Sequence, residues 1–265
     1  MPRAKTYRGR LVRNKRYHNK KMHWVTSYVR YGLELGVYSD AFDIFIRTLV
    51  RRIKKNLQNV IIVTGDTGSG KSTICIEIAM ELAKALNTTF DLDVDYVYGA
   101  EDLWNKLNQP GASPISLFDE GSVSLNSMNS RKTGDRDIVV ILDTMRSRGL
   151  TTIIALPDIR QCNPSIRRIH ANYVIECSSV EHPFVKGYDR GFFEVKDKRF
   201  SKKKRYDPDP WWNVLYTGIF GPLPPKIDEQ YQKIKRARQD GLLIDIRNRN
   251  FVERTEKRQN YDILE

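Results

Sequence analysis

Three glycines, a lysine and a serine lie close together in the stretch GDTGSGKST, at positions 65 to 73. The spacing Gly-x-x-x-x-Gly-Lys-Ser is typical of a loop whose backbone amides surround phosphate groups. Glycine is needed because its missing Cβ permits the conformations that turn successive amides inward. The lysine then reaches the β- and γ-phosphates, and the serine hydroxyl coordinates Mg²⁺. We expect the following residues to bind the nucleotide: Gly65, Asp66, Thr67, Gly68, Ser69, Gly70, Lys71, Ser72 and Thr73.

Two adjacent carboxylates, Asp119 and Glu120, follow an apolar run that begins at Ile115. A carboxylate at the end of a strand can hold a metal ion, and its neighbour can polarise a water for in-line attack on the γ-phosphate. We assign Mg²⁺ to Asp119 and the water to Glu120. With Lys71, these residues form the predicted catalytic set, with Ser72 and Asp119 as metal ligands, and the expected reaction is hydrolysis.

The expected substrate is ATP. An N-K-x-D guanine motif is absent from the sequence, which weakens a GTPase interpretation. An LSGGQ-type signature is also absent, which makes a transporter ATPase a poor match.

These residues need a sheet that brings strand ends together. Apolar β-branched runs alternate with helical patterns, which indicates parallel strands joined by helices. The expected strands are Val60–Thr64, Val94–Tyr98, Ile115–Asp119, Thr151–Leu156, Ala171–Cys177 and Phe192–Val195. The expected helices are Asp40–Lys55, Ser72–Leu86, Glu101–Leu107, Arg136–Ser147 and Asp228–Gln239.

The predicted fold is therefore α/β: a mostly parallel P-loop sheet flanked by helices, with a basic N-terminal extension and an irregular C-terminal extension. We expect a basic arm at 1–38, an ATPase core with a leading amphipathic helix at 39–195, and a C-terminal extension at 196–265. The segment DPDPWWNVLYTGIFGPLPPKI, rich in proline and aromatic residues, cannot form a regular helix.

The charge of the chain favours a polyanionic partner. The net charge is +13, and nine basic residues but no acidic one lie between Met1 and Lys21, with tyrosines interleaved. Such an arm can neutralise phosphates while aromatic rings stack on bases, although a solvated tail has the same composition. The leading helix extends the basic surface through Arg47, Arg51, Arg52, Lys54 and Lys55.

The location follows from what the sequence lacks. The charged N-terminus has no apolar signal region, and no apolar run is long enough for a membrane span. The three cysteines have no C-x-x-C spacing. We expect a protein of the cytoplasm, in a prokaryotic or virus-infected host cell.

The stretch from Asp143 to Ser179, DTMRSRGLTTIIALPDIRQCNPSIRRIHANYVIECSS, resembles the FtsK/HerA-like superfamily of DNA-pumping ATPases, of the additional-strand, catalytic-glutamate type. There the acidic-pair strand is followed by a helix ending in basic residues and glycine, a strand, an I-R segment and a closing strand. The similarity spans roughly Val60 to Ser179. The family usually places a polar residue, often glutamine, where this strand ends in Leu156-Pro157-Asp158. The compact chain resembles the packaging and zonular-occludens-toxin-like ATPases of archaeal and bacterial viruses and mobile elements more than a chromosome translocase.

The resemblance implies a homo-oligomeric ring in which an arginine of one subunit completes the site of the next. The arginines that match this role are Arg146, Arg148, Arg167 and Arg131. For each of them, a structural or phosphate-contacting role is an open alternative.

The leading hypothesis is an ATP-driven nucleic-acid motor that translocates or packages double-stranded DNA. One alternative is a DNA-binding ATPase switch, such as a replication initiator or helicase loader. Others are an assembly or secretion ATPase, which needs a partner to reach the membrane, and a small-molecule kinase.

Overall fold

In the computed structural model, the described residues are 42–109, 111–119, 133–144, 146–181, 189–199, 211–238 and 240–241, with short strands at 7–8, 28–29 and 37–38. The chain divides into two compact units, Met1–Leu223 and Pro224–Glu265. In the second unit, residues 225–238 form a helix. Among the described helices, none is long and apolar enough to cross a membrane.

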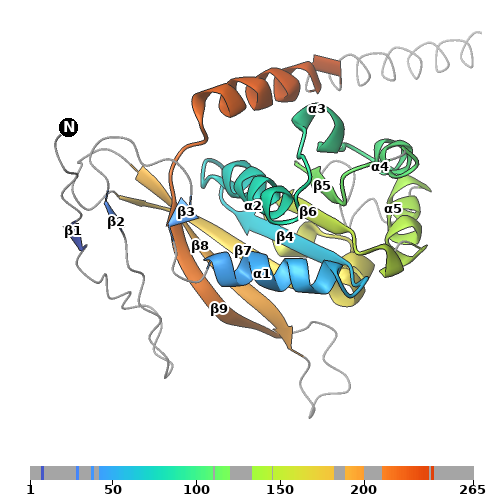
Figure 1. Cartoon of the computed structure of the whole chain (residues 1–265), viewed down its shortest axis with the longest axis horizontal. Coiled ribbons are helices and arrows are strands. Elements are labelled where there is room, and N and C mark those ends of the chain that lie inside the picture. The colour runs from blue at the N-terminus through green and yellow to red at the C-terminus, as the bar shows by residue number, and fades with distance from the viewer. Residues whose placement is uncertain are drawn as a thin grey trace, which may run out of the picture. The chain divides into compact units, whose positions relative to one another are not determined.

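The first unit is built on a seven-stranded sheet in the order β3-β9-β8-β7-β4-β6-β5, drawn in Figure 1. Four neighbouring strands, β7, β4, β6 and β5, are parallel, and β8, β9 and β3 extend the sheet in antiparallel pairs. A separate two-stranded pair joins β1 (Tyr7–Arg8) to β2 (Tyr28–Val29). The large sheet consists of β3 (Val37–Tyr38), β4 (Asn59–Gly65), β5 (Ile115–Phe118), β6 (Thr151–Leu156), β7 (Tyr173–Glu181), β8 (Asp189–Arg199) and β9 (Trp211–Phe220).

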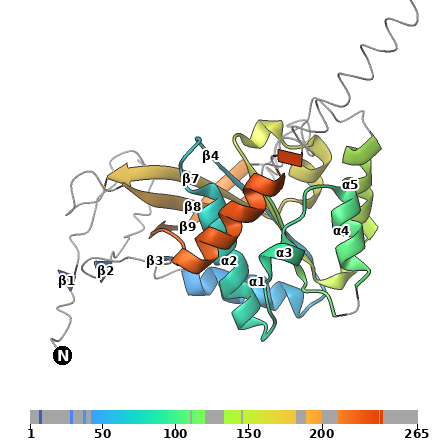
Figure 2. The same cartoon turned by 90° about the horizontal axis from the view of Figure 1, so that it is seen from above.

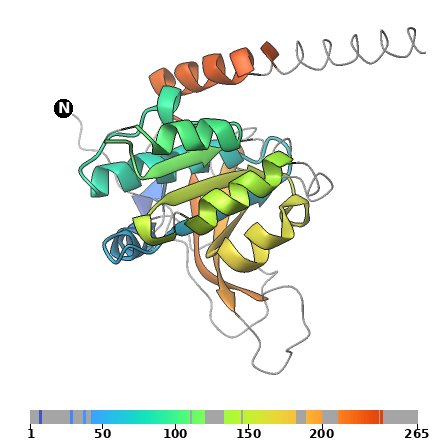
Figure 3. The same cartoon turned by 90° about the vertical axis from the view of Figure 1, so that its right-hand side faces the viewer.

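Helices cover both faces of this sheet, so the predicted α/β fold is confirmed. Helices α1 and α2 pack on one face (Figure 1), where Phe45 of α1 meets Tyr173 of β7 edge-on at 5.2 Å between ring centroids. On the other face α4 and α5 lie side by side (Figures 2 and 3). The helical segments are α1 (Phe42–Ile53), α2 (Lys71–Ala85), α3 (Leu92–Asp95), α4 (Ala100–Leu107), α5 (Thr133–Thr144), η2 (Arg146–Arg148), η3 (Ile159–Gln161) and the π-helical turn η4 (Ile166–His170).

Strand β6 lies between the strand that precedes the glycine loop and the strand that precedes Asp119. Its residues pair in parallel with both neighbours, Ile153 with Ile61 of β4 and with Leu117 of β5. All three strands are fully buried except at Gly65. Their carboxyl ends therefore meet at one edge, where the loop and the carboxylate both project.

The expected strand at Val94–Tyr98 is wrong. This segment forms the four-residue helix α3 followed by a single parallel bridge from Tyr96 to Leu117. Asp91 accounts for the helix, because its side chain accepts a hydrogen bond from the backbone N–H of Asp93 at 2.9 Å. Val94 is 42% exposed, so its apolar side chain does not belong to the core.

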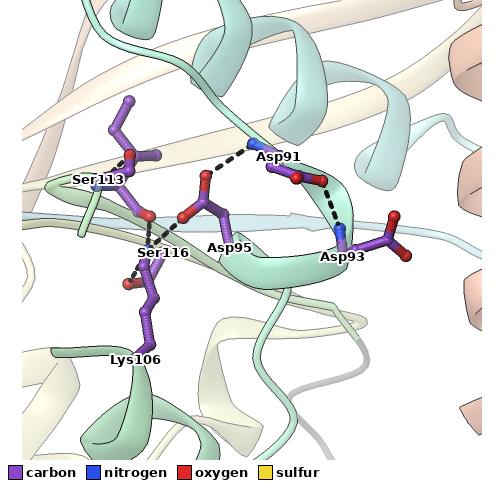
Figure 4. Close-up of polar contacts among 7 residues, drawn as sticks. Asp91, Asp93, Asp95, Lys106, Ser113 and Ser116 are labelled. Carbon is purple, nitrogen blue, oxygen red and sulfur yellow. Dashed lines mark hydrogen bonds and ion pairs between the residues drawn. The ribbon is translucent and has the colours of Figure 1, made fainter. Parts of the chain in front are cut away.

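A buried ion pair ties α3 and α4 to the start of β5 (Figure 4). The Nζ of Lys106 lies 2.9 Å from Oδ1 of Asp95, and each side chain is 2% exposed. Lys106 also donates to the backbone carbonyl of Ile115 and to Oγ of Ser116. The strand that leads to Asp119 is thus fixed at its other end by polar contacts in the interior.

Regular structure also continues beyond the expected core. Strand β8 runs through the expected boundary between residues 195 and 196, and residues 211–220, expected to be irregular, form β9. Strand β9 pairs with β8 along its length, with a shift in register between Val195 and Lys196. Its last residue, Phe220, pairs with Val37 of β3. The strand therefore joins the end of the expected basic arm to the large sheet.

Candidate functional site

The loop after β4 has the backbone conformations that its glycines permit. The φ angles of Gly65, Gly68 and Gly70 are 147°, 81° and 83°, in the region that residues with a Cβ rarely adopt. At Gly65 a Cβ would also lie 2.3 Å from the carbonyl oxygen of Cys177 on β7. The tight turn therefore depends on glycine for backbone angle and for space.

Helix α2 begins at Lys71, directly after this turn. Its N-cap is Gly70, which has no side chain to accept hydrogen bonds from the first-turn amides. Those amides, together with the positive end of the helix dipole, form a surface that attracts anions. This is the physical basis for phosphate binding at the loop.

The side chain of Lys71 folds back over the loop. Its Nζ donates hydrogen bonds to the backbone oxygens of Gly65 at 2.8 Å and Asp66 at 2.7 Å. The ammonium is thus held beside the same amides that would surround a phosphate group. From this position it can neutralise phosphate charge.

The structure brings Ser72 and Asp119 together from different elements. Oγ of Ser72, in the first turn of α2, lies 3.0 Å and 2.9 Å from the two carboxylate oxygens of Asp119, which follows β5. The carboxylate is 5% exposed. A hydroxyl and a carboxylate are the hard oxygen ligands that Mg²⁺ prefers, and phosphate oxygens and waters usually complete its shell. The donor set therefore fits Mg²⁺ bound to a nucleotide.

Groups of three or more metal-binding His, Cys, Asp or Glu side chains are absent from the described residues.

Four further predicted site residues are Glu120 and the arginines at 131, 146 and 148. Glu120 and Arg131 fall outside the described residues. Arg146 and Arg148 form η2, just before β6 begins at Thr151, and Thr151 pairs with Asn59 at the start of β4. They therefore lie near the opposite edge of the sheet from the loop, about 20 Å away along the seven residues of β4.

Arg167 lies in the π-helical turn η4, which comes just before β7. Burial raises the pKa of the Cys162 thiol to about 12, against the opposing effect of the nearby Arg167 charge. Arg167 also contributes to the low pKa of Asp158, although hydrogen bonds from Arg160 are the main cause. Its charge therefore acts on two side chains that follow β6 in the chain.

Sequence reasoning missed Arg160, which lies near the loop. The backbone N–H of Gly65 donates to the carbonyl of Pro157 at 3.3 Å, so the loop is joined to the end of β6. Three residues later, Arg160 pairs with Asp158 at 2.6 Å between Nη2 and Oδ2. The Asp158 side chain also accepts from the backbone N–H of Arg160 and begins η3. This chain therefore has an Asp–Arg pair just after the end of β6, and the spacing D-I-R was its signal in the sequence.

Phe220 is a second residue that the sequence did not indicate. A Cβ on Gly70 would lie 2.6 Å from Cε2 of the Phe220 ring, and a Cβ on Gly191 of β8 would lie 2.1 Å from its Cζ. The ring, 2% exposed, therefore lies directly against the backbone where α2 begins. The last residue of β9 supports the phosphate loop from the side of the antiparallel strands.

The cysteines near the loop are not suited to nucleophilic chemistry. Burial raises the pKa of Cys75 well above its ordinary value, with a further contribution from Asp119. Burial also raises the pKa of Cys177 to about 12. Both thiols stay protonated near neutral pH, so their role at the site is packing.

Comparisons with known proteins agree with this site. The protein-family model described as Novel STAND NTPase 3 matches residues 45–158, which include the glycine loop and Asp119. No curated protein shows significant sequence similarity to the chain.

Three similar solved structures have low sequence identity. The N-terminal domain of zonular occludens toxin from Neisseria meningitidis has 12% identity and a TM-score of 0.38, over 65% of this chain and 98% of that chain. The genome packaging NTPase of Sulfolobus turreted icosahedral virus 2, in complex with AMPPCP, has 14% identity and a TM-score of 0.40, over 63% and 98%. A KaiC-like protein from Pyrococcus horikoshii OT3 has 15% identity and a TM-score of 0.30, over 60% and 88%.

The glycine loop, the Ser72–Asp119 contact and the family match lead to one conclusion. The chain is an NTPase of the P-loop class.

Proposed function

We propose that the chain hydrolyses ATP in a Mg²⁺-dependent reaction and uses the energy to move double-stranded DNA. The observation on which the hydrolysis step depends is the Ser72–Asp119 contact beside the glycine loop. It supports the proposal because a hydroxyl and a carboxylate, both suited to Mg²⁺, lie at the end of the loop whose amides would bind the phosphates.

Each residue then has a distinct role in hydrolysis. Amides of the loop and Lys71 bind the β- and γ-phosphates, and Ser72 and Asp119 hold Mg²⁺, which neutralises charge that develops on the phosphates. Glu120, the next residue along the chain, accepts a proton from the attacking water. Two adjacent carboxylates with separate tasks favour water as the phosphoryl acceptor.

The proposed DNA partner follows from charge. The net charge of +13 and the basic arm favour a polyanion, and the segment from Asp143 to Ser179 resembles DNA-pumping ATPases. The distance of Arg146 and Arg148 from the loop of their own chain is compatible with action on a neighbouring subunit. We therefore include a homo-oligomeric ring in the proposal.

The test is a phosphate-release assay on four proteins, with and without long duplex DNA. The wild type should hydrolyse ATP only with Mg²⁺ and be stimulated several-fold by DNA. Lys71→Ala should lose nucleotide binding, whereas Glu120→Gln and Asp119→Asn should bind ATP and lose turnover by roughly a hundredfold or more.

The mass in solution of the Glu120→Gln variant with ATP tests the homo-oligomeric ring. This variant should accumulate the ATP-bound assembly, so its mass should be a multiple of the monomer mass. Normal turnover by Glu120→Gln would remove Glu120 from the mechanism. Hydrolysis that is indifferent to DNA would favour an assembly ATPase, and slow turnover with binding to one defined sequence would favour a switch.

A further inference from the structure

A groove lined by cations lies between α1 and the end of α2. It is lined by Arg47, Val50, Arg51, Lys54, Lys55 and Ala85. All four cationic residues are exposed, and the groove has no acidic lining residue. Helices α1 and α2 lie side by side on the same face of the sheet (Figure 1).

These four cations differ from the other basic residues around them. Arg52 of the same helix donates to Oδ1 of Asn59 at 2.8 Å and to the carbonyl of Gln58 at 2.9 Å, so it has a structural role. Lys84 of α2 pairs with Glu81 at 3.6 Å. Within the described part of the chain, no carboxylate forms an ion pair with a cation of the groove.

The arrangement is unfavourable for the protein alone. Arg47 and Arg51 are four residues apart on α1, and like charges at this spacing repel on a helix. Part of the cluster lies near the carboxyl end of α1, where the helix dipole favours positive charge, but Arg47 lies a turn earlier. A bound polyanion would remove the repulsion along the whole groove.

The groove is separate from the nucleotide site. Ala85 is the last residue of α2 and Lys71 the first, so the two ends of this helix are about 20 Å apart. A nucleotide held by the glycine loop does not reach the groove. The anion that the groove fits therefore belongs to a second ligand.

We propose that this groove binds the backbone phosphates of duplex DNA through Arg47, Arg51, Lys54 and Lys55. The proposal rests on the proposed DNA partner and gives it a surface on the ATPase core. From Arg47 to Lys54 the chain advances about 10 Å at the helical rise, and the same length of duplex axis has about six phosphate charges. Arg47 and Arg51 on successive turns of α1, with Lys54 and Lys55 just after its end, match a short stretch of one duplex.

The experiment compares two variants of the full chain that remove the same charge. The site variant replaces Arg47, Arg51, Lys54 and Lys55 by glutamine. The control variant replaces Lys226, Lys233, Arg236 and Arg238, exposed residues of the helix at 225–238, by glutamine. Each removes two arginines and two lysines. Binding of a labelled duplex is measured by fluorescence anisotropy at several salt concentrations, and ATPase activity is measured without DNA.

We expect the site variant to bind duplex DNA more weakly. The slope of log K against log salt should become shallower by up to about 3.6, or about 0.9 for each phosphate that the variant no longer neutralises. The slope of the control should change by much less. Both variants should keep the basal ATPase activity of the wild type, which shows that the nucleotide site is intact.

Equal slopes for the site and control variants would overturn the proposal, since only total charge would then matter. So would a loss of binding to anionic lipid vesicles in the site variant with duplex binding unchanged. Absence of DNA binding by an active wild type would instead refute the DNA partner in the proposed function.

Discussion

Lys106 is a lysine in the interior, with a side chain that is 2% exposed. Burial lowers its pKa, while Asp95 acts in the opposite direction. Removing one member of a buried pair leaves the other charge without compensation, which typically costs about 3–5 kcal/mol. A short helix with one lysine gave no sign of this in the sequence, because the pair joins segments that are not neighbours in a helical pattern.

We predict that Lys106→Met lowers the free energy of unfolding by about 3–5 kcal/mol. The double variant Lys106→Met with Asp95→Leu should be more stable than Lys106→Met alone. Urea unfolding measures both. Lys84→Met, which removes an exposed pair with Glu81, is the control and should change stability by less than about 1 kcal/mol. A double variant no more stable than the single one would show that the uncompensated charge is not the cause.

His170 is a titratable residue of the interior, 2% exposed. Its Nδ1 accepts a hydrogen bond from Nε2 of Gln58 at 3.1 Å, so the neutral ring has its proton on Nε2, 3.5 Å from Oδ1 of Asp143. Burial lowers the pKa of His170, Asp143 opposes this, and Arg146 and Lys198 add to the lowering. The neutral form is therefore favoured in the folded protein.

The folded protein should become less stable as the pH falls, because His170 resists protonation in the folded state. With the folded pKa below the ordinary value of 6.5, the unfolded chain binds more protons as the pH falls below 6.5. Stability should fall with acidification until the folded pKa is passed, with a contribution from this group of at most about 1.4 kcal/mol per pH unit. Urea unfolding of the wild type and His170→Asn between pH 7.5 and 5 measures it. The variant should have the smaller slope, and equal slopes would contradict the assignment.

At the scale of elements, local pattern predicted the strands of the parallel sheet well. The run at Thr151–Leu156 is a strand with the expected bounds, because all six side chains are buried and its composition is apolar and β-branched. The glycine loop could also be predicted locally, because the residues expected to bind the phosphates are consecutive in the sequence. Its contact with Asp119 was expected from the rule that parallel strands end at one edge.

The antiparallel extension was harder to predict. Residues 211–220 contain a glycine and are followed by prolines, which hides the strand β9 in the sequence. Their strand conformation is stabilised by pairing with β8, a contact that no local pattern reveals. The role of Phe220 beside Gly70 was invisible for the same reason.

We predict that Phe220→Leu raises the KM for ATP by up to roughly tenfold, equivalent to about 1.4 kcal/mol of phosphate binding. The physical reason is that the ring supports the backbone at Gly70, where the loop joins α2. The turnover number should change little, because no catalytic side chain is removed. Steady-state ATPase kinetics measure both constants.

Phe193→Leu is the matched control. Phe193 is 1% exposed and lies 6.2 Å from Phe220 between ring centroids, but it is not among the nearest atoms at Gly70. This variant should be less stable and have an unchanged KM. A similar rise in KM for the two variants would mean that core packing in general, not the contact with Gly70, sets nucleotide affinity.

For the whole molecule, the excess positive charge is distributed over separate segments. Nine basic residues lie between Met1 and Lys21, and four more line the groove of α1 and α2. Binding to a polyanion should therefore have at least two independent contributions. Composition alone predicted the class of partner, but only the fold showed which cations already have structural partners.

We predict that deletion of Met1 to Lys21 weakens duplex binding and makes its salt dependence shallower, by about 0.9 in the slope for each phosphate that the arm neutralises. Combined with the glutamine substitutions in the groove, the two reductions in slope should add. Anisotropy titrations at several salt concentrations measure this. An unchanged slope after the deletion would mean that the arm neutralises no phosphates.

The pairing of Phe220 has a mechanical consequence. Its backbone pairs with β3, which forms the last two residues of the expected basic arm, while its ring touches Gly70 just before α2. Tension applied through the arm would thus reach a glycine of the phosphate loop. Because β3 is only two residues long, its ladder should separate at low load, which would limit the force transmitted to the loop.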